Sequence, residues 1–182
     1  MEGSSPDVLR AGVLDGARVV VAGVGDLGEA VGARAAGLGA EVERLPVDPW
    51  ADEPQRPVAS ACSCGTAAAL ALRPGVDGVR AALDGAWLAI RAVGGARVDR
   101  GGLIVLLAPP PGDARAEAAR AGLESLARTS SIEWARFCVR PVAVLPGAGT
   151  AAGEVAELTA YLASPAGAHY AGCAFTLGVA PG

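Results

Sequence analysis

The chain has 182 residues, of which 52% are hydrophobic, and its formal net charge is −4. This length can bury one substantial core but is short for two, so we expect a single domain over 16–182 behind a flexible lead-in, 1–15. The acidic balance excludes a basic surface for nucleic acid, and no apolar run reaches the roughly 20 residues of a membrane-spanning helix. The polar start is unlike a secretory signal, so we expect a cytoplasmic protein.

All 15 basic residues are arginine, and the chain contains neither lysine nor asparagine. It therefore offers no ammonium or asparagine carboxamide to a reaction. The four cysteines (Cys62, Cys64, Cys138 and Cys173) do not have the spacing of a zinc site or the density of a disulfide scaffold, so we expect buried free thiols and no metal. The only histidine, His169, has no evident ligand partners nearby in the sequence.

The amino-terminal half begins with a strand-helix-strand pattern. Residues 17–23 (ARVVVAG) predict a buried strand, 26–38 a helix and 40–47 a second strand. Residues 48–57 contain three prolines and predict a surface connection that replaces roughly one strand-helix unit, so the fold is expected to be shortened after its second strand. The sequence VASACSCG, 58–65, predicts a short buried strand that leads into a turn.

The middle of the chain contains the clearest strand. An alanine-rich helix is expected over about 76–95, and the apolar run bounded by Gly-Gly and Pro-Pro-Pro at 101–112 predicts a parallel strand buried on both faces. Residues 113–137 predict a long helix. We expect its apolar positions to be Ala119, Leu123, Leu126, Ile132, Trp134 and Ala135.

The carboxyl-terminal part repeats the alternation, with a strand at 139–147, a helix at 152–164 and a last strand at 172–178. Strands that alternate with helices form right-handed crossovers. The fold class predicted is α/β, a Rossmann-like doubly wound, mostly parallel sheet with helices on both faces.

A glycine-rich turn follows the first strand. Gly23, Gly25 and Gly28 have the general Rossmann spacing and are the candidate cofactor-binding residues. Asp26 and Glu29 place carboxylates where the start of a helix would otherwise attract phosphate. We therefore expect no cofactor, or NAD(P) bound weakly, and a mainly structural role for the three glycines.

Several segments in this order resemble the short-chain dehydrogenase/reductase family. They are LDGARVVVAG, GLGAEV, DGAWLAIRAV, RAGLESLARTSSIEWARFCVRPVAVLPG and AELTAYLASPAGAHYAGCAFTLG. The resemblance implies hydride transfer between NAD(P) and an alcohol or carbonyl carbon. In that family a tyrosine serves as general acid/base, a lysine lowers its pKa, a serine polarises the carbonyl and an asparagine completes the proton relay.

The matching positions in this chain lack those side chains. The tyrosine falls on Ala116, the lysine on Arg120, the serine on Ala108 or Pro109, and the asparagine near Ala82. An alanine methyl group can neither donate nor accept the proton that accompanies hydride transfer. The resemblance therefore implies that no catalytic residue is present.

The matching cofactor-binding positions also depart from the family. The ribose partner at the end of the second strand falls on Pro46, with Asp48 two residues on. The family's N-N-A-G after its fourth strand matches 62–65, Cys-Ser-Cys-Gly.

The segments that resemble the family best are those that form its subunit contacts. The resemblance implies one contact through the fourth and fifth helices and another through the last helix and strand, and the candidate interface residues are Trp87, Trp134 and Tyr170. We therefore expect a non-catalytic subunit in a hetero-dimer or hetero-tetramer with an active homologous dehydrogenase or ketoreductase, including one that acts on acyl thioesters.

Two alternatives stay open at this stage. The chain is an unusual active reductase that uses Arg120 or a water as proton source, although arginine is not deprotonated in proteins. Alternatively, it is a nucleotide-sensing Rossmann module that binds through Gly23 to Gly28 without reaction.

Overall fold

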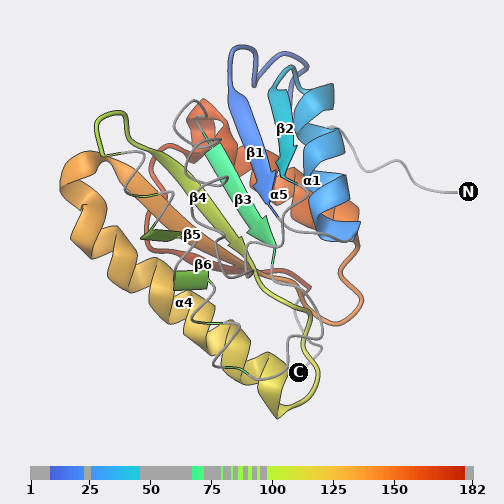
Figure 1. Ribbon diagram of the computed structural model, residues 1–182. Coiled ribbons are helices and arrows are strands. Elements are labelled where there is room, and N and C mark those ends of the chain that lie inside the picture. Colours follow the sequence, from blue (N-terminus) through green and yellow to red (C-terminus); the bar gives the residue numbers. More distant parts are fainter. Residues whose placement is uncertain are drawn as a thin grey trace, which may run out of the picture.

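The computed structural model describes residues 9–22, 26–45, 67–71, 79, 83, 86–87, 90–91, 94 and 98–178. In these described residues, six strands form one parallel sheet in the order β2-β1-β3-β4-β5-β6 (Figure 1). The strands are β1 (Arg18–Ala22), β2 (Glu41–Leu45), β3 (Ala67–Ala71), β4 (Gly102–Leu107), β5 (Val139–Leu145) and β6 (Ala174–Thr176). The helices are α1 (Asp26–Gly37), α4 (Ala114–Trp134) and α5 (Ala152–Ala163), with 3-10 turns at η1 (Ala135–Phe137) and η2 (Pro165–Gly167).

Helices cover both faces of the sheet, as the doubly wound prediction requires. α1 and α5 pack together on one face, and α4 lies on the other (Figure 1). The described positions between 79 and 94 are helical and lie beside α4, because a methyl group at Gly122 of α4 would overlap Leu83. The predicted fold class, a Rossmann-like parallel sheet between two helical layers, is confirmed.

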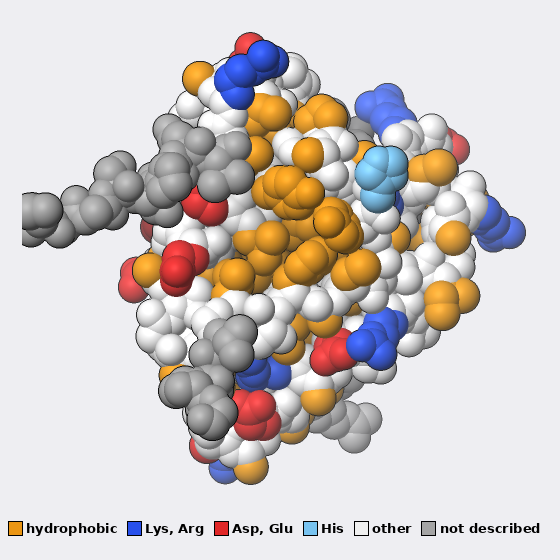
Figure 2. All heavy atoms as spheres, turned by 180° about the vertical axis from the view of Figure 1, so that it is seen from behind, with side chains coloured by type: hydrophobic (Ala, Val, Ile, Leu, Met, Phe, Trp, Pro, Cys, Tyr) orange, Lys and Arg blue, Asp and Glu red, His pale blue; other side chains and the backbone are white. Residues whose placement is uncertain are grey.

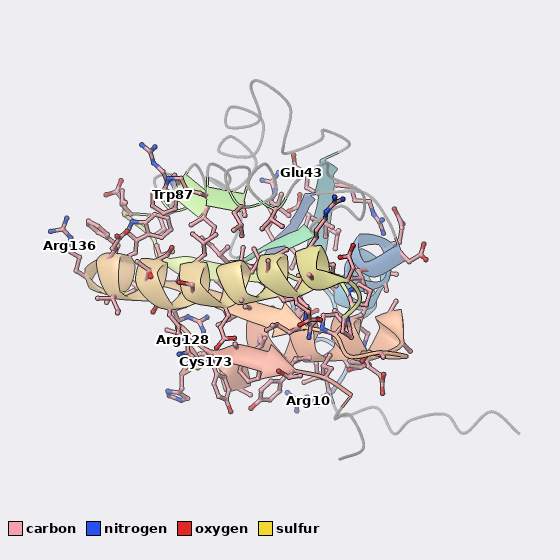
Figure 3. All side chains as sticks on the ribbon, turned by 90° about the horizontal axis from the view of Figure 1, so that it is seen from below. Arg10, Glu43, Trp87, Arg128, Arg136 and Cys173 are labelled. Atoms are coloured by element: carbon pink, nitrogen blue, oxygen red, sulfur yellow. The ribbon has the colours of Figure 1, made fainter. Side chains whose placement is uncertain are left out.

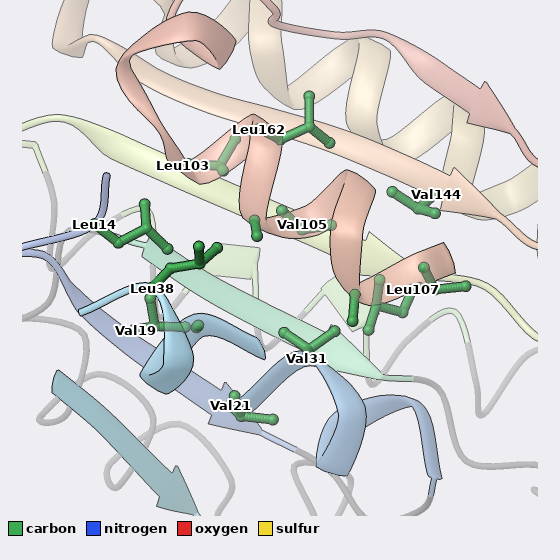
Figure 4. Close-up of a cluster of buried hydrophobic side chains, with 14 of the residues drawn as sticks. Leu14, Val19, Val21, Val31, Leu38, Leu103, Val105, Leu107, Val144 and Leu162 are labelled. Carbon is green, nitrogen blue, oxygen red and sulfur yellow. The ribbon is translucent and has the colours of Figure 1, made fainter. Parts of the chain in front are cut away.

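Alternation along the strands divides the core between the two faces. Val20 of β1 joins the cluster under α4, whereas Val19 and Val21 join the cluster under α1 and α5 (Figure 4). β4 is buried on both faces, with every residue from Leu103 to Leu107 at most 3% exposed. Its apolar run therefore forms the strand that was predicted between the Gly-Gly and Pro-Pro-Pro boundaries.

The third strand lies later in the chain than predicted. The prediction placed a strand at 58–65, which lies outside the described residues, whereas β3 covers Ala67–Ala71 and pairs with β1 and β4. Its sequence is AAALA. Alanine has high helix propensity and low strand propensity, so only the position between two neighbouring strands makes this segment extended.

Part of the predicted lead-in belongs to the core. Leu9 and Leu14 are 8% and 2% exposed, and the Leu14 N–H donates to the Leu38 carbonyl at 3.0 Å. This contact fixes the chain that enters β1 against the end of α1. The lead-in therefore joins the fold from Leu9 onward.

The long α4 helix was predicted with nearly its observed bounds, but two of its apolar positions are not in the core. Asp113 caps the helix by accepting from the N–H groups of Arg115 and Ala116 at 3.0 Å. Ile132 is 79% exposed and Ala135 is exposed, contrary to the prediction. At about 100° per residue, Ile132 shares its helical face with residues four positions before and after it, and those are arginines in solvent.

One expected burial is also wrong at the start of β5. Cys138 was expected to be a buried thiol, but it is exposed. It ends η1 in the left-handed conformation, with φ 55°, and the backbone turns there from helix to strand. The sharp turn directs the side chain outward. Cys173, the other described cysteine, is half-buried and also has a free thiol.

Candidate functional site

Ligands of open parallel sheets bind at the carboxyl ends of the strands, near the point where the strand order reverses. That point lies between β1 and β3, because β2 lies on one side of β1 whereas β3 to β6 follow on its other side. Of the three predicted cofactor-binding glycines, Gly23 and Gly25 lie outside the described residues. Gly28 is buried in the first turn of α1.

The start of α1 is acidic, and one of its carboxylates pairs with an arginine of β2. The Glu29 carboxylate forms an ion pair with the Arg44 guanidinium on β2, and Arg44 Nη2 also lies 3.4 Å from the Glu29 carbonyl oxygen. Asp26, the first residue of the helix, is exposed. The Asp26 and Glu29 carboxylates complement the positive end of the helix dipole from within the chain.

The positions matched to the family's hydroxyl-bearing residues hold no hydroxyl group. Ala116 lies in the first turn of α4, and its N–H is already bonded to Asp113. Ala108, at the end of β4, is fully buried, and Pro109 after it is half-buried. No proton donor or acceptor is therefore supplied by the side chains at these three positions.

Arg120 lies one turn after Ala116 on α4 and reaches the ends of two strands. Its Nη1 donates to the Pro109 carbonyl at 2.7 Å and to the Pro146 carbonyl at 2.6 Å. Its Nε lies 3.7 Å from Glu117 Oε2. Because Pro109 follows β4 and Pro146 follows β5, the guanidinium sits at the edge where a ligand would bind.

The location of β3 corrects one of the matched motifs. Residues 62–65 were matched to the family's N-N-A-G, which follows a strand, but in this chain they precede β3. The residues that follow β3 are Leu72, Arg73, Pro74 and Gly75. Pro46, Asp48 and Ala82, the other matched positions, lie outside the described residues.

Neither tyrosine lies on the α4 side of the sheet. Tyr161 of α5 and Tyr170 have ring centroids 6.2 Å apart, and Tyr170 meets the Phe175 ring edge-on at 5.3 Å. A side-chain hydrogen bond with Tyr170 raises the pKa of Tyr161. Arg140 Nη1 lies 3.3 Å from the Tyr170 carbonyl, and burial lowers the pKa of Arg140. We call Tyr161, Tyr170 and Phe175 the aromatic cluster.

The three candidate interface residues divide between two surfaces. Trp134, on α4, is half-buried against the core and covers Gly94, and Trp87 is half-buried with the Arg91 guanidinium 5.8 Å from its ring. Figure 3 shows Trp87 beside the carboxyl-terminal end of α4. Tyr170 lies with the α5 side of the core, on the opposite face of the sheet.

The described residues show neither a metal site nor a membrane span. No three His, Cys, Asp or Glu side chains among them come together as metal ligands. None of the described helices has the length and apolar content needed to cross a membrane.

Sequence comparisons give no relatives: no protein-family model and no curated protein matches this chain. Solved structures do match. A citronellol catabolism dehydrogenase from Pseudomonas aeruginosa superposes with a TM-score of 0.75 and 24% identity, over 93% of this chain and 96% of the other. A short chain dehydrogenase from Mycobacterium smegmatis gives a TM-score of 0.77 and 23% identity, over 98% of both chains.

This chain has the fold of a short-chain dehydrogenase. A hydroxysteroid dehydrogenase from Escherichia coli shares that fold too, with a TM-score of 0.73 and 13% identity over 90% of this chain and 95% of the other. At these identities the likeness concerns the fold. Within this fold, Arg120 bonds to the carbonyls that follow β4 and β5, and Glu29 pairs with Arg44. These described side chains are therefore already bonded within the chain.

Proposed function

We propose that the chain is a non-catalytic member of the short-chain dehydrogenase family. In this proposal it assembles in the cytoplasm with an active homologous NAD(P)-dependent dehydrogenase or ketoreductase, which it stabilises or regulates. The observation that carries the proposal is the state of Arg120: its guanidinium is bonded to two backbone carbonyls, and the residue one turn before it is Ala116. Neither side chain can therefore exchange the proton that accompanies hydride transfer.

A second consideration disfavours an arginine-driven reductase. Arginine stays protonated in proteins and has no acceptor lone pair, so it can neither accept the proton of an alcohol nor readily release one to a carbonyl oxygen. Arg120 is also only 8% exposed, and its Nη1 is already shared between Pro109 and Pro146. Both observations support a structural role for this side chain.

The outer face of α4 supports the assembly part of the proposal. This face carries small side chains and one large apolar side chain, all of them exposed, and we call it the α4 face. It consists of Ala114, Ala118, Ala121, Ser125, Thr129 and Ile132. Small residues allow another helix to approach closely, and an isoleucine that is 79% exposed loses contact with water when a partner covers it.

Arginines flank the α4 face near its carboxyl-terminal end. Arg128 bonds to Glu124 on the same helix at 2.6 Å, and Arg136 lies over the Phe137 ring at 4.5 Å. Figure 3 shows Arg136 at the end of α4 and Arg128 on the side away from Trp87. A partner helix on this face would meet small side chains along most of its length and charged side chains at the carboxyl-terminal end.

The opposite side of the molecule offers a second surface. Hydrophobic side chains gather in the middle of the face shown in Figure 2, and half-buried Leu158, Leu177 and the aromatic cluster belong to that side of the core. β6 is the edge strand next to it. Two surfaces on opposite faces favour a hetero-tetramer over a simple pair.

A homologous subunit is the partner that these surfaces favour. At a two-fold interface each helix face packs on a copy of itself, so a divergent copy of the same helix retains a near-matching surface. The proposal extends to an active partner that reduces a ketone, including the keto group of an acyl thioester.

Co-purification tests the proposal. The full chain carrying an affinity tag should be isolated from its own cells, and the retained proteins identified by mass spectrometry. We expect a homologue with the serine, tyrosine and lysine in place, and NADPH-dependent ketone reduction only in fractions that contain it. A purified homo-oligomer of this chain that reduces a ketone with NADPH would contradict the proposal.

A further inference from the structure

Arg120 is the one charged side chain that is buried among the residues described by the structure. An arginine is rarely buried unless its charge is balanced and its donors are used. Here the nearby Glu117 carboxylate, 3.7 Å from Nε, balances the charge, and the Pro109 and Pro146 carbonyls accept from Nη1.

The two acceptors belong to different loops. Pro109 lies in the connection from β4 to α4, and Pro146 in the connection from β5 to α5. One guanidinium therefore links these two loops at the carboxyl ends of β4 and β5. The hydrogen bonds between β4 and β5 continue up to the residue before Pro109, because the Ala108 N–H donates to the Val144 carbonyl at 2.9 Å.

The loop after β5 is also held from its other side. The Gly147 N–H donates to Thr150 Oγ1 at 2.9 Å, and the backbone of Leu177 and Gly178 lies so close to Gly147 that a side chain there would overlap it. The Leu177 N–H donates to the Leu145 carbonyl at 3.1 Å. This loop is therefore fixed by contacts within the chain on both sides.

We propose that Arg120 is an internal ligand: its guanidinium occupies the crevice end between β4 and β5 and orders both loops in place of a bound molecule. Parallel sheets of this type bind ligands at the carboxyl ends of their strands, where backbone groups are available to hydrogen-bond. In this chain the donor to the Pro109 and Pro146 carbonyls is the Arg120 side chain of α4. The inference concerns the chain by itself and holds whichever partner it has.

Removal of the guanidinium should be measurable as lost stability that a small cation restores. In Arg120→Ala the two carbonyls lose a charged donor, so the melting temperature should fall on the order of 10 °C. Methylguanidinium, added to the full-length variant at about 50 mM, should restore several degrees by binding the vacated position. Arg128→Ala is the matched control on the same helix, and it should melt within about 2 °C of the unaltered chain without a methylguanidinium response.

A second variant keeps the test decisive if Arg120→Ala does not fold. Arg120→Lys retains the charge, but an ammonium lacks the planar fork of the guanidinium. Amide hydrogen exchange in 108–113 and 146–151 should then be at least tenfold faster than in the unaltered chain, with exchange in β1 unchanged. The inference is overturned if exchange in both loops is unchanged in Arg120→Lys. It is also overturned if Arg120→Ala melts with the control, or is destabilised without rescue, since packing alone would then explain the residue.

Discussion

The indole ring of Trp134 lies directly over Gly94, so close that a side-chain methyl group at Gly94 would overlap the ring. Trp134 ends α4, and Gly94 lies at the end of the helical positions that begin at Val79. The glycine thus lets two helices on one face of the sheet come together. Trp134, which was predicted as an interface residue, is at least partly used inside the chain.

Substitution of Gly94 by alanine tests this packing. The added methyl group has to displace the ring, so we expect the free energy of unfolding in urea to fall by about 2 kcal/mol. In the double variant Gly94→Ala/Trp134→Ala the overlap is absent, so the loss should be smaller than the sum of the two single losses. Strictly additive losses would show that the two side chains do not interact.

Ile132 tests the α4 face. Because the side chain is 79% exposed, Ile132→Asp should change the free energy of unfolding by less than about 0.5 kcal/mol. The same change places a charge on the large apolar side chain's position in the proposed interface, so we expect the homologous partner to be lost from the affinity-purified complex.

Ala148→Asp, at an exposed position in the loop after β5, is the control and should retain the partner. Retention of the partner by Ile132→Asp, with the complex intact on size-exclusion chromatography, would remove the α4 face from the assembly.

The aromatic cluster predicts a pH effect. The hydrogen bond with Tyr170 favours the neutral phenol and raises the pKa of Tyr161 in the folded chain. Its contribution to stability is therefore complete below the unfolded pKa of about 10 and is lost as the pH rises through the folded value. Ultraviolet titration of Tyr170→Phe should show the remaining Tyr161 ionising at lower pH than in the unaltered chain. Identical midpoints would rule out the coupling.

Cofactor titration tests whether the carboxyl ends of the strands bind a dinucleotide. With Arg120 between the ends of β4 and β5, and with Glu29 at the start of α1, calorimetry with NADH or NADPH should give a dissociation constant no tighter than about 1 mM. An active short-chain dehydrogenase titrated in parallel serves as the positive control. Micromolar binding by the purified chain would instead support the nucleotide-sensing alternative.

The parts of the fold that were predictable have strong local patterns. β4 is a continuous apolar run between glycines and prolines, and α4 begins at a capping aspartate, so both elements were predicted close to their observed bounds. β3 was misplaced because AAALA has no strand signal of its own, and only hydrogen bonds from β1 and β4 extend it.

The site was predictable in composition but not in contacts. The matched positions already showed alanine in place of tyrosine and arginine in place of lysine, but no local signal indicated that Arg120 would reach Pro146, 26 positions away. Ile132 could have been found from the sequence, because Arg128 and Arg136 lie one turn to each side of it on the same helical face.

The central claim, that this chain carries out no hydride transfer itself, is tested most directly with deuterium-labelled NADPH. The purified full chain would be incubated with the labelled cofactor and a panel of ketones and acyl thioesters, and the alcohols analysed by mass spectrometry. We predict no deuterium in any alcohol above the level of a protein-free control. Deuterated alcohol formed by the unaltered chain above that level would contradict the account.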